Sequence, residues 1–214
     1  MKYLQNLLLK KHSEMNIDRI YYINCDHRLD RKLHIESLLS SLNINNDIIQ
    51  RVSGVYIPEN GSLGCVRSHI KILNDSIENN YENILVLEDD FEINEINKFV
   101  ENINKVNKIE YDIIMLACNL KKYITTEYDF LYKVLEAQTS SAYILNKKFS
   151  KYLLKSYKES ERELEKNMDS DLYALDQNWK KIQPKYKWFC FNPLLGMQME
   201  SWSDIEKKNT NYKC

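Results

Sequence analysis

The sequence predicts an α/β protein with a mostly parallel central sheet, because short apolar runs alternate along the chain with amphipathic helical windows. The expected strands are Arg19–Asn24 and residues 48–56, 83–87 and 111–117. Apart from its first residue, the run 83–87 (NILVL) is entirely apolar, which is typical of a strand buried on both faces. One helical window separates each strand from the next. This order favours parallel pairing, with helices flanking the sheet.

The expected helices are marked by apolar side chains that recur every three or four residues. These sets are Leu33, Leu38, Leu39 and Leu42; Val66, Ile70, Leu73 and Ile77; and Ile96, Phe99, Val100, Ile103 and Val106. Beyond Cys118 the pattern loosens. There we expect a strand pair at 128–138, a strand at 142–145, a helix around Phe149–Tyr152–Leu153–Tyr157, a helix at 169–181 and an aromatic-rich strand at 186–191.

The composition indicates one folded domain. The chain has 214 residues, of which 43% are hydrophobic and 29% charged, so it can build a core and global disorder is excluded. Thirty basic residues against 31 acidic residues give a net charge of −1, which argues against a nucleic-acid or membrane-surface binder. Because no repeat or linker divides the sequence, we expect a single domain over 1–214, with an N-terminal extension at 1–18 and a loose tail at 206–214.

The location of the protein is expected to be the cytoplasm. Five cysteines are widely spaced without a C-x-x-C pair, which fits a reducing compartment better than a disulfide framework. No run approaches the length of a membrane span or a signal-peptide core. The richness in Lys, Asn and Ile suggests an AT-rich genome, either bacterial or that of a large DNA virus; a viral protein would lie in the host cytoplasm or the virion.

Three consecutive acids, Glu88, Asp89 and Asp90, follow directly on the apolar run 83–87. They therefore lie at the carboxyl end of a strand, the edge where open α/β sheets bind ligands. Adjacent carboxylates repel one another, and a hard cation such as Mg²⁺ or Mn²⁺ relieves that repulsion. The alternative is that Asp89 or Asp90 caps the next helix, but one cap does not need three acids. We favour a metal site.

A glycine-rich segment precedes the second helix. Three of the four glycines lie within residues 54–64, where they provide a positive φ or a close approach of the backbone. A ligand-binding loop and an ordinary surface loop are equally good interpretations. Arg67, Ser68 and His69 follow, near a helix N-terminus that attracts anions, although a lone histidine is more often structural.

A second acidic cluster comprises Asp169, Asp171 and Asp176. Asp169 has an alternative role as a helix N-cap, and Asp176 as a surface acid. Asp171 has the least obvious structural role, so it is the first candidate for a general base that removes a hydroxyl proton.

Taken together, these segments resemble glycosyltransferase family 25, which includes lipopolysaccharide galactosyltransferases and collagen galactosyltransferase domains. The pair GSLGCVRSH and LVLEDD carries the resemblance. In chain order, the matching segments are IYYINCDHRLDRK, RVSGV, GSLGCVRSHIKIL, NILVLEDDFEI, TSSAYILNKKFSKYLL, MDSDLYALD and PLLGMQMESWSDI. They span about Ile20 to Ile205.

The resemblance implies a single GT-A-like (Rossmann-like) domain that transfers a sugar, galactose or glucose, from a UDP-sugar. The acceptor would be a glycan or a protein-linked hydroxyl group, and the reaction would be metal-dependent and inverting. Mn²⁺ or Mg²⁺ is the implied cofactor. The implied partners are the UDP-sugar donor and a glycan or glycoprotein acceptor, without nucleic acid.

The resemblance also implies roles for individual residues. Asp89 and Asp90 match the metal-binding acids, although this sequence reads Glu-Asp-Asp instead of the usual Asp-x-Asp. Asp171, or else Asp169, matches the catalytic base. The implied donor-binding residues are Asn24, Arg28, Arg31, Gly54, Gly64, Ser68, His69 and Glu88, and the C-terminal, acceptor-side residues are Gln198, Ser203 and Asp204.

Two other function classes remain open from the sequence. A catalytically inactive family member would bind a sugar nucleotide or glycan without turnover. A metal-dependent phosphoesterase also places acids at strand ends, but its nuclease form is disfavoured by the balanced charge.

Overall fold

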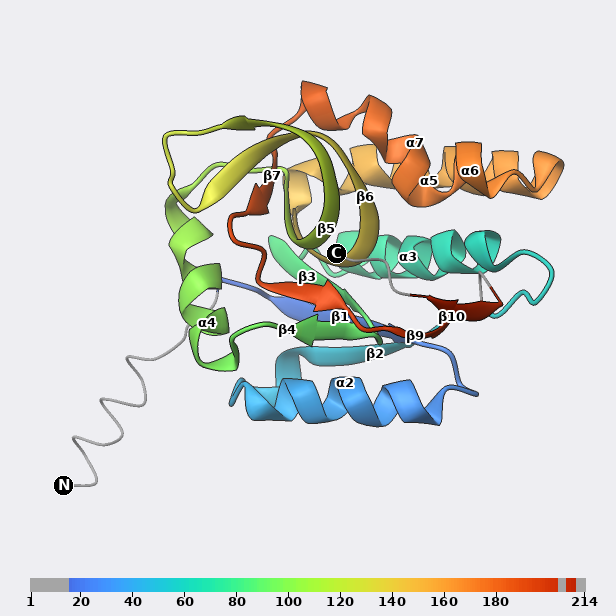
Figure 1. Cartoon of the computed structure of the whole chain (residues 1–214), viewed down its shortest axis with the longest axis horizontal. Coiled ribbons are helices and arrows are strands. Elements are labelled where there is room, and N and C mark those ends of the chain that lie inside the picture. Colours follow the sequence, from blue (N-terminus) through green and yellow to red (C-terminus); the bar gives the residue numbers. More distant parts are fainter. Residues whose placement is uncertain (1–15, 204–206, 211–214) are drawn as a thin grey trace.

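The computed structural model (Figure 1) describes residues 16–203 and 207–210, and its centre is a six-stranded sheet. The strand order is β2-β1-β3-β6-β5-β7. β1 pairs in parallel with β2 and β3, and β5 pairs in parallel with β7. Within this sheet β6 is the one antiparallel strand, running opposite to β3, β5 and β7. The prediction of a mostly parallel α/β sheet is therefore confirmed.

The elements have the following bounds. The sheet strands are β1 (Arg19–Asn24), β2 (Ile49–Ser53), β3 (Asn83–Glu88), β5 (Ile113–Thr125), β6 (Leu131–Asn146) and β7 (Trp188–Phe191). Two small antiparallel pairs are formed by β4 (Phe91–Ile93) with β8 (Gly196–Gln198) and by β9 (Ser201–Ser203) with β10 (Lys208–Thr210). The α-helices are α2 (Leu29–Ser41), α3 (Gly61–Glu78), α4 (Ile96–Lys105), α5 (Lys147–Asn167), α6 (Ser170–Tyr173) and α7 (Leu175–Asn178). Short 3₁₀ turns cover Asn46–Ile48, Val106–Lys108, Trp179–Lys181 and Gln183–Lys185.

Helices cover both faces of the sheet, because its central strands are apolar on both sides (Figure 1). On β1, Tyr21 belongs to one core, whereas its neighbours Ile20 and Tyr22 belong to the other. The first core contains side chains of α3 and α5, and the second contains side chains of α2 and α4. Representative members are Val66, Leu73 and Leu153 for the first and Ile35, Leu39, Phe99 and Ile103 for the second.

The second half of the sheet differs from the prediction. The expected strand pair at 128–138 and the expected strand at 142–145 are one continuous strand, β6, and β5 continues past residue 117 to Thr125. The pairing of β5 with β6 has several register shifts, for example between Met115 and Ala117. Such irregularities break the two-residue alternation on which a sequence-based strand assignment depends.

The prediction of one helix at 169–181 is also wrong. Ala174 is extended (φ −52°, ψ 149°), and this separates α6 from α7. The break is a tertiary effect, since alanine has a high helix propensity. Directly after it, Asp176 Oδ2 accepts a hydrogen bond from the backbone N–H of Thr139 in β6.

The described ends of the chain are attached to the domain. Ile17 is buried, and Asp18 accepts hydrogen bonds from the backbone N–H groups of Glu82 and Asn83. At the other end, the described part of the expected loose tail contains β10, which pairs with β9. The remainder of the expected extension and tail lies outside the described residues.

Candidate functional site

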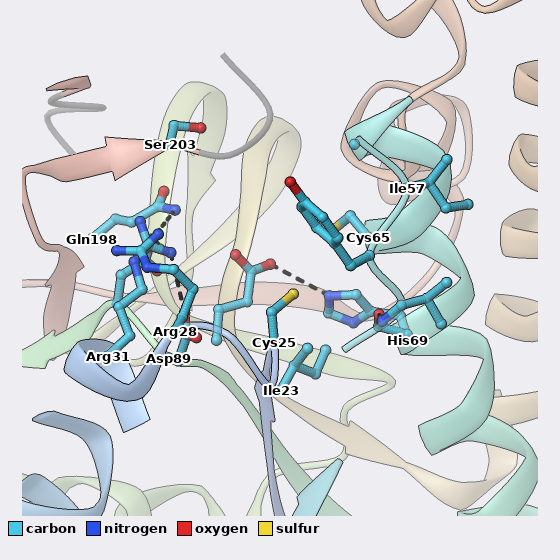
Figure 2. Close-up of a pocket in the computed structure, with 16 residues that line it drawn as sticks. Ile23, Cys25, Arg28, Arg31, Ile57, Cys65, His69, Asp89, Gln198 and Ser203 are labelled. Carbon is cyan, nitrogen blue, oxygen red and sulfur yellow. Dashed lines mark hydrogen bonds and ion pairs between the residues drawn. The ribbon is translucent and has the colours of Figure 1, made fainter. Parts of the chain in front are cut away.

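A cavity of about 120 Å³ lies where the parallel strands β1, β2 and β3 end. Figure 2 shows Arg28, Arg31 and Gln198 on one side of it and Cys65 and His69 on the other. The cavity thus forms at the sheet edge where ligands bind in open α/β folds. Its lining residues are Ile23, Cys25, Arg28, Arg31, Val55, Tyr56, Ile57, Gly61, Cys65, Ser68, His69, Glu88, Asp89, Asp90, Gln198 and Ser203.

The two aspartates of the acidic triplet share one arginine. Arg31 Nη1 lies 3.1 Å from Asp89 Oδ1 and 2.9 Å from Asp90 Oδ2. Asn24 Nδ2 donates to Asp89 Oδ2 at 2.7 Å, and Gln198 Nε2 donates to Asp90 Oδ2 at 3.1 Å. The structure therefore brings together five residues from the predicted metal, donor and C-terminal sets.

Burial controls the protonation of these acids. It raises the pKa of Asp90 to about 7; Arg31 opposes the shift, and the charges of Glu88 and Asp89 add to it. Burial also raises the pKa of Asp89, although Arg31 and the Asn24 hydrogen bond work in the opposite direction. One guanidinium thus leaves the carboxylates incompletely neutralised.

The residues present fit a divalent cation held mainly by Asp90. Asp90 Oδ1 is buried and has no hydrogen-bond partner among the described residues, whereas both oxygens of Asp89 are engaged. An unpartnered buried carboxylate oxygen is costly unless a ligand or an ion completes it. Mg²⁺-type ions commonly take one or two protein carboxylates together with waters and substrate phosphates.

The glycines bring the loop that follows β2 close to its neighbours. A Cβ on Gly64 would lie 2.3 Å from the carbonyl oxygen of Val55, and a Cβ on Gly54 would lie 2.9 Å from Cys25 Sγ. No glycine of the described chain has a positive φ, so close approach is their role here. The expected loop at 54–64 is shorter than predicted, because α3 already begins at Gly61 with Asn60 as its cap.

Ser68 and His69 both serve the cavity wall from α3. Ser68 Oγ accepts from the Val55 N–H at 2.8 Å and donates to the Gly64 carbonyl at 2.8 Å, which ties the loop to the helix. The fully buried His69 contacts Glu88 Oε1 through Nε2 at 3.3 Å and the Tyr143 hydroxyl through Nδ1 at 2.9 Å. Arg67 does not supplement the site, since it pairs with Glu161 and Glu165 of α5.

Glu88 lines the cavity as a carboxylate. Burial disfavours its charge, but the hydrogen bond and charge of His69 and a 2.6 Å hydrogen bond from Ser140 outweigh this, so its pKa is lowered. Glu88 therefore presents a negative charge to the cavity that it lines.

A second cavity, of about 280 Å³, adjoins the first. Cys65, Glu88 and Gln198 line both cavities, so the two meet along these side chains. Asp171 lines the second cavity and is exposed. Asp169 lines neither; its carboxylate accepts from the Leu172 N–H at 3.1 Å, which is the helix-capping role that the sequence left open.

Asp176, for which the sequence left open the role of a surface acid, is part of the candidate site. It lines the second cavity, and its carboxylate accepts a hydrogen bond from Thr139 N–H at 3.0 Å. Burial raises the pKa of Asp176, the Thr139 hydrogen bond lowers it in part, and the charge of Glu88 raises it further. Thr139 has a φ of 78°, a strained value for a β-branched residue and one found at functional sites. No local sequence pattern predicts this contact between β6 and α7.

The C-terminal residues divide into two groups. Gln198 and Ser203 line the first cavity, and Ser203 is buried. Asp204, the third predicted residue of this segment, lies outside the described residues. Arg31 Nη2 donates to Ser201 Oγ at 2.6 Å and to the Trp202 carbonyl at 2.9 Å, which holds β9 beside the cavity.

The mostly parallel six-stranded sheet, with an acidic cavity at its strand ends, has a GT-A-like α/β fold. The model of glycosyltransferase family 25 (LPS biosynthesis protein) matches residues 59–173, more than half of the chain. The chain belongs to this family.

Two solved structures share the fold. One is a mannose-1-phosphate geranyltransferase from Thermus thermophilus, with a TM-score of 0.50 and 8% identity, covering 89% of this chain and 76% of that one. The other is a glycosyltransferase involved in the glycosylation of the major capsid of PBCV-1, with a TM-score of 0.50 and 12% identity, covering 88% and 95%. At these identities the similarity supports the fold alone. No curated protein matches the sequence. Among the described helices, none has the length and apolar character needed to span a membrane.

Proposed function

We propose that this family 25 glycosyltransferase transfers galactose or glucose from a UDP-sugar to a glycan or a protein-linked hydroxyl group, with inversion. The observation that carries the proposal is the pair of cavities that meet at Glu88. A transferase must hold a donor and an acceptor side by side, and two adjoining compartments provide that arrangement.

The first cavity is assigned to the donor. Arg28 and Arg31 line it and provide cationic partners for a diphosphate, for which the arginine fork is well suited. Tyr56, half exposed on its wall, provides an aromatic face against which a base can stack. Asn24, Gly54, Gly64, Ser68 and His69 shape this compartment through the contacts described above.

Asp90, assisted by Asp89, would hold the divalent cation. Bound Mn²⁺ or Mg²⁺ supplies Lewis-acid stabilisation of the negative charge that develops on the departing nucleotide. The protein itself contributes the pairing of Arg31 with both acids, which positions them, and the hydrogen bond from Gln198, which closes the cavity on the C-terminal side.

The second cavity is assigned to the acceptor, with Asp176 as the preferred general base and exposed Asp171 as the second choice. A base that works near neutral pH benefits from a raised pKa, and burial gives Asp176 this property. Its hydrogen bond with Thr139 fixes its orientation. Asp169 is the least favoured, because its carboxylate caps α6. We also assign the enzyme to the cytoplasm, on the cysteine pattern of the sequence.

A thermal-shift screen of nucleotide sugars with and without Mn²⁺ tests the proposal. Ligand binding stabilises the folded state by mass action, so a UDP-sugar with Mn²⁺ should raise the melting temperature more than a GDP- or CMP-sugar does. Asp90→Asn, which keeps the shape of the side chain, should remove the dependence on Mn²⁺. A shift that needs no metal in the native protein would overturn the metal assignment, and the absence of any preference for UDP would overturn the donor assignment.

A further inference from the structure

A cluster of three metal-ligating side chains lies at the junction of the two cavities. The ligand atoms of Cys65, His69 and Glu88 all lie within 4.8 Å of one another. Among the described residues no other group of at least three His, Cys, Asp or Glu side chains meets this condition. The cluster does not include Asp89 or Asp90, the aspartates assigned to the cation that accompanies the sugar donor.

The fold brings these three groups together from two elements. Cys65 and His69 are four residues apart on α3, so their side chains lie on one face of the helix. Glu88 ends β3, and its Oε1 is 3.3 Å from His69 Nε2. Figure 2 shows Cys65 and His69 on the same wall of the cavity.

The ligand atoms of the cluster favour a cation that binds sulfur. Thiolate, imidazole and carboxylate together are ligands of Zn²⁺, whereas the oxygen-only Asp89–Asp90 pair suits Mg²⁺ or Mn²⁺. In a tetrahedral zinc site, neighbouring ligand atoms are about 3.5 Å apart. Side-chain rotations that move these ligand atoms by about 1 Å would therefore bring them to the distances that a bound zinc ion requires. Three protein ligands leave a fourth position for water or a substrate oxygen.

The hydrogen-bond partner that a histidine ligand needs is already in place. Histidine ligands of zinc usually hydrogen-bond through their other ring nitrogen, and His69 Nδ1 lies 2.9 Å from the Tyr143 hydroxyl. That hydroxyl can donate or accept, so it serves either tautomer of His69. Burial and the charge of Glu88 raise the pKa of Cys65 well above its ordinary value, so the thiol carries a proton until a cation displaces it.

We propose that Cys65, His69 and Glu88 bind one Zn²⁺ ion at the junction of the cavities and that the bound ion inhibits sugar transfer. Binding forms a zinc–sulfur bond and releases the thiol proton of Cys65 to solvent. His69 binds through Nε2 as the neutral imidazole with its proton on Nδ1, a second ring proton, where present, leaving to solvent, and Glu88 is already ionised. Because Cys65 and Glu88 line both cavities, the ion would obstruct the contact between donor and acceptor. The inhibitory part rests on the proposed function, whereas the binding part does not.

Titration of the metal-free protein with Co²⁺, a spectroscopic substitute for Zn²⁺, tests the binding. We expect one thiolate-bound Co²⁺ per chain, seen as a thiolate-to-cobalt charge-transfer band that Zn²⁺ displaces; Co²⁺ at the oxygen ligands of Asp90 adds no such band. Cys65→Ala should abolish the band and weaken Co²⁺ binding by more than about tenfold. The loss of a ligand should cost more than the loss of a residue that only hydrogen-bonds a ligand, which already weakens metal binding by about tenfold or more. Cys25→Ala is the matched control, since Cys25 lines the same cavity but is outside the cluster, and it should keep the band. Asp90→Asn should also keep it.

The absence of a thiolate band, or a band that survives Cys65→Ala, overturns the site. If Cys65→Ala does not fold, alkylation of the unmodified protein gives the answer, because Zn²⁺ should slow modification of Cys65 but not of Cys25, and equal rates would refute binding. For inhibition, micromolar Zn²⁺ should lower sugar transfer several-fold, with recovery once Zn²⁺ is removed and Mn²⁺ is supplied again. The ratio of activities with and without Zn²⁺ should approach one in Cys65→Ala. Zinc binding without inhibition overturns the obstruction alone, and a protein without transfer activity still tests binding.

Discussion

The assignment of Asp176 as the general base leads to the sharpest prediction. Asp176→Asn removes the proton acceptor but keeps an oxygen that can accept the hydrogen bond from Thr139 N–H. General-base catalysis contributes about 10²- to 10⁴-fold to a rate, which corresponds to about 2.7–5.4 kcal/mol of transition-state stabilisation. We therefore expect kcat to fall by that factor with little change in melting temperature.

Asp176→Ala separates the structural role from the catalytic one. Alanine leaves the Thr139 N–H without its partner, at a cost of about 1–3 kcal/mol. For a chain of this size, each kcal/mol lowers the melting temperature by about 2–4 °C. The Ala variant should thus lose as much kcat as the Asn variant and be less stable, because the strained backbone of Thr139 (φ 78°) loses its anchor.

The assay is UDP release in the presence of an acceptor selected from a glycan array, with Asp171→Asn as the matched control. Asp171 lines the same cavity but is exposed, so its Asn variant should retain most of its kcat. In the native enzyme, kcat/KM should rise with pH through the pKa of Asp176, which burial places above the ordinary aspartate value of 3.8. If Asp176→Asn keeps its kcat while Asp171→Asn loses it, the assignment of the base is refuted.

Two further predictions concern the donor cavity. A Cβ at Gly64 would lie 2.3 Å from the Val55 carbonyl oxygen, so Gly64→Ala must displace the loop by about 1 Å. Overpacking lowers the free energy of unfolding by about 1–3 kcal/mol, and the higher helix propensity of alanine raises it by about 1 kcal/mol. Calorimetric affinity for UDP should fall while the melting temperature drops by only a few degrees, and an unchanged affinity would contradict the role of this close approach. Asp90 has a pKa of about 7 in the folded protein against 3.8 when unfolded, so the native state binds the extra proton and metal-free stability should decline as pH rises between these values. Asp90→Asn should flatten that decline in melting temperature against pH, and a slope equal to that of the native protein would show that Asp90 is not its source.

Much of the first half of the fold is predictable from sequence. β1 and β3 lie where their apolar runs place them, and α3 covers the expected apolar positions. The reason is that these strands are buried on both faces and separated by helices, so local hydrophobicity and tertiary burial agree. β6 is not predicted as one strand, because its register shifts against β5 interrupt the alternation of buried and exposed residues.

The candidate site divides in the same way. The acids after β3 follow from the position of that strand, and the structure gathers Asn24, Arg31 and Gln198 around them. Asp176 was not predictable, because its importance depends on a contact with Thr139, 37 residues earlier in the chain. The ion pairs of Arg31 were equally hidden, since charge partners across elements leave no spacing in the sequence. The catalytic roles of all these residues stay predictions.

The guanidinium of Arg31 holds two parts of the molecule simultaneously. Through Nη1 it contacts the acids after β3, and through Nη2 it holds Ser201 and Trp202 in β9. A donor phosphate that binds this group, as the proposed function has it, would compete with one of those attachments. Under the proposed function, binding in the cavity and the position of β9 would be thermodynamically linked, so contacts that hold β9 would tune how readily a nucleotide enters and leaves.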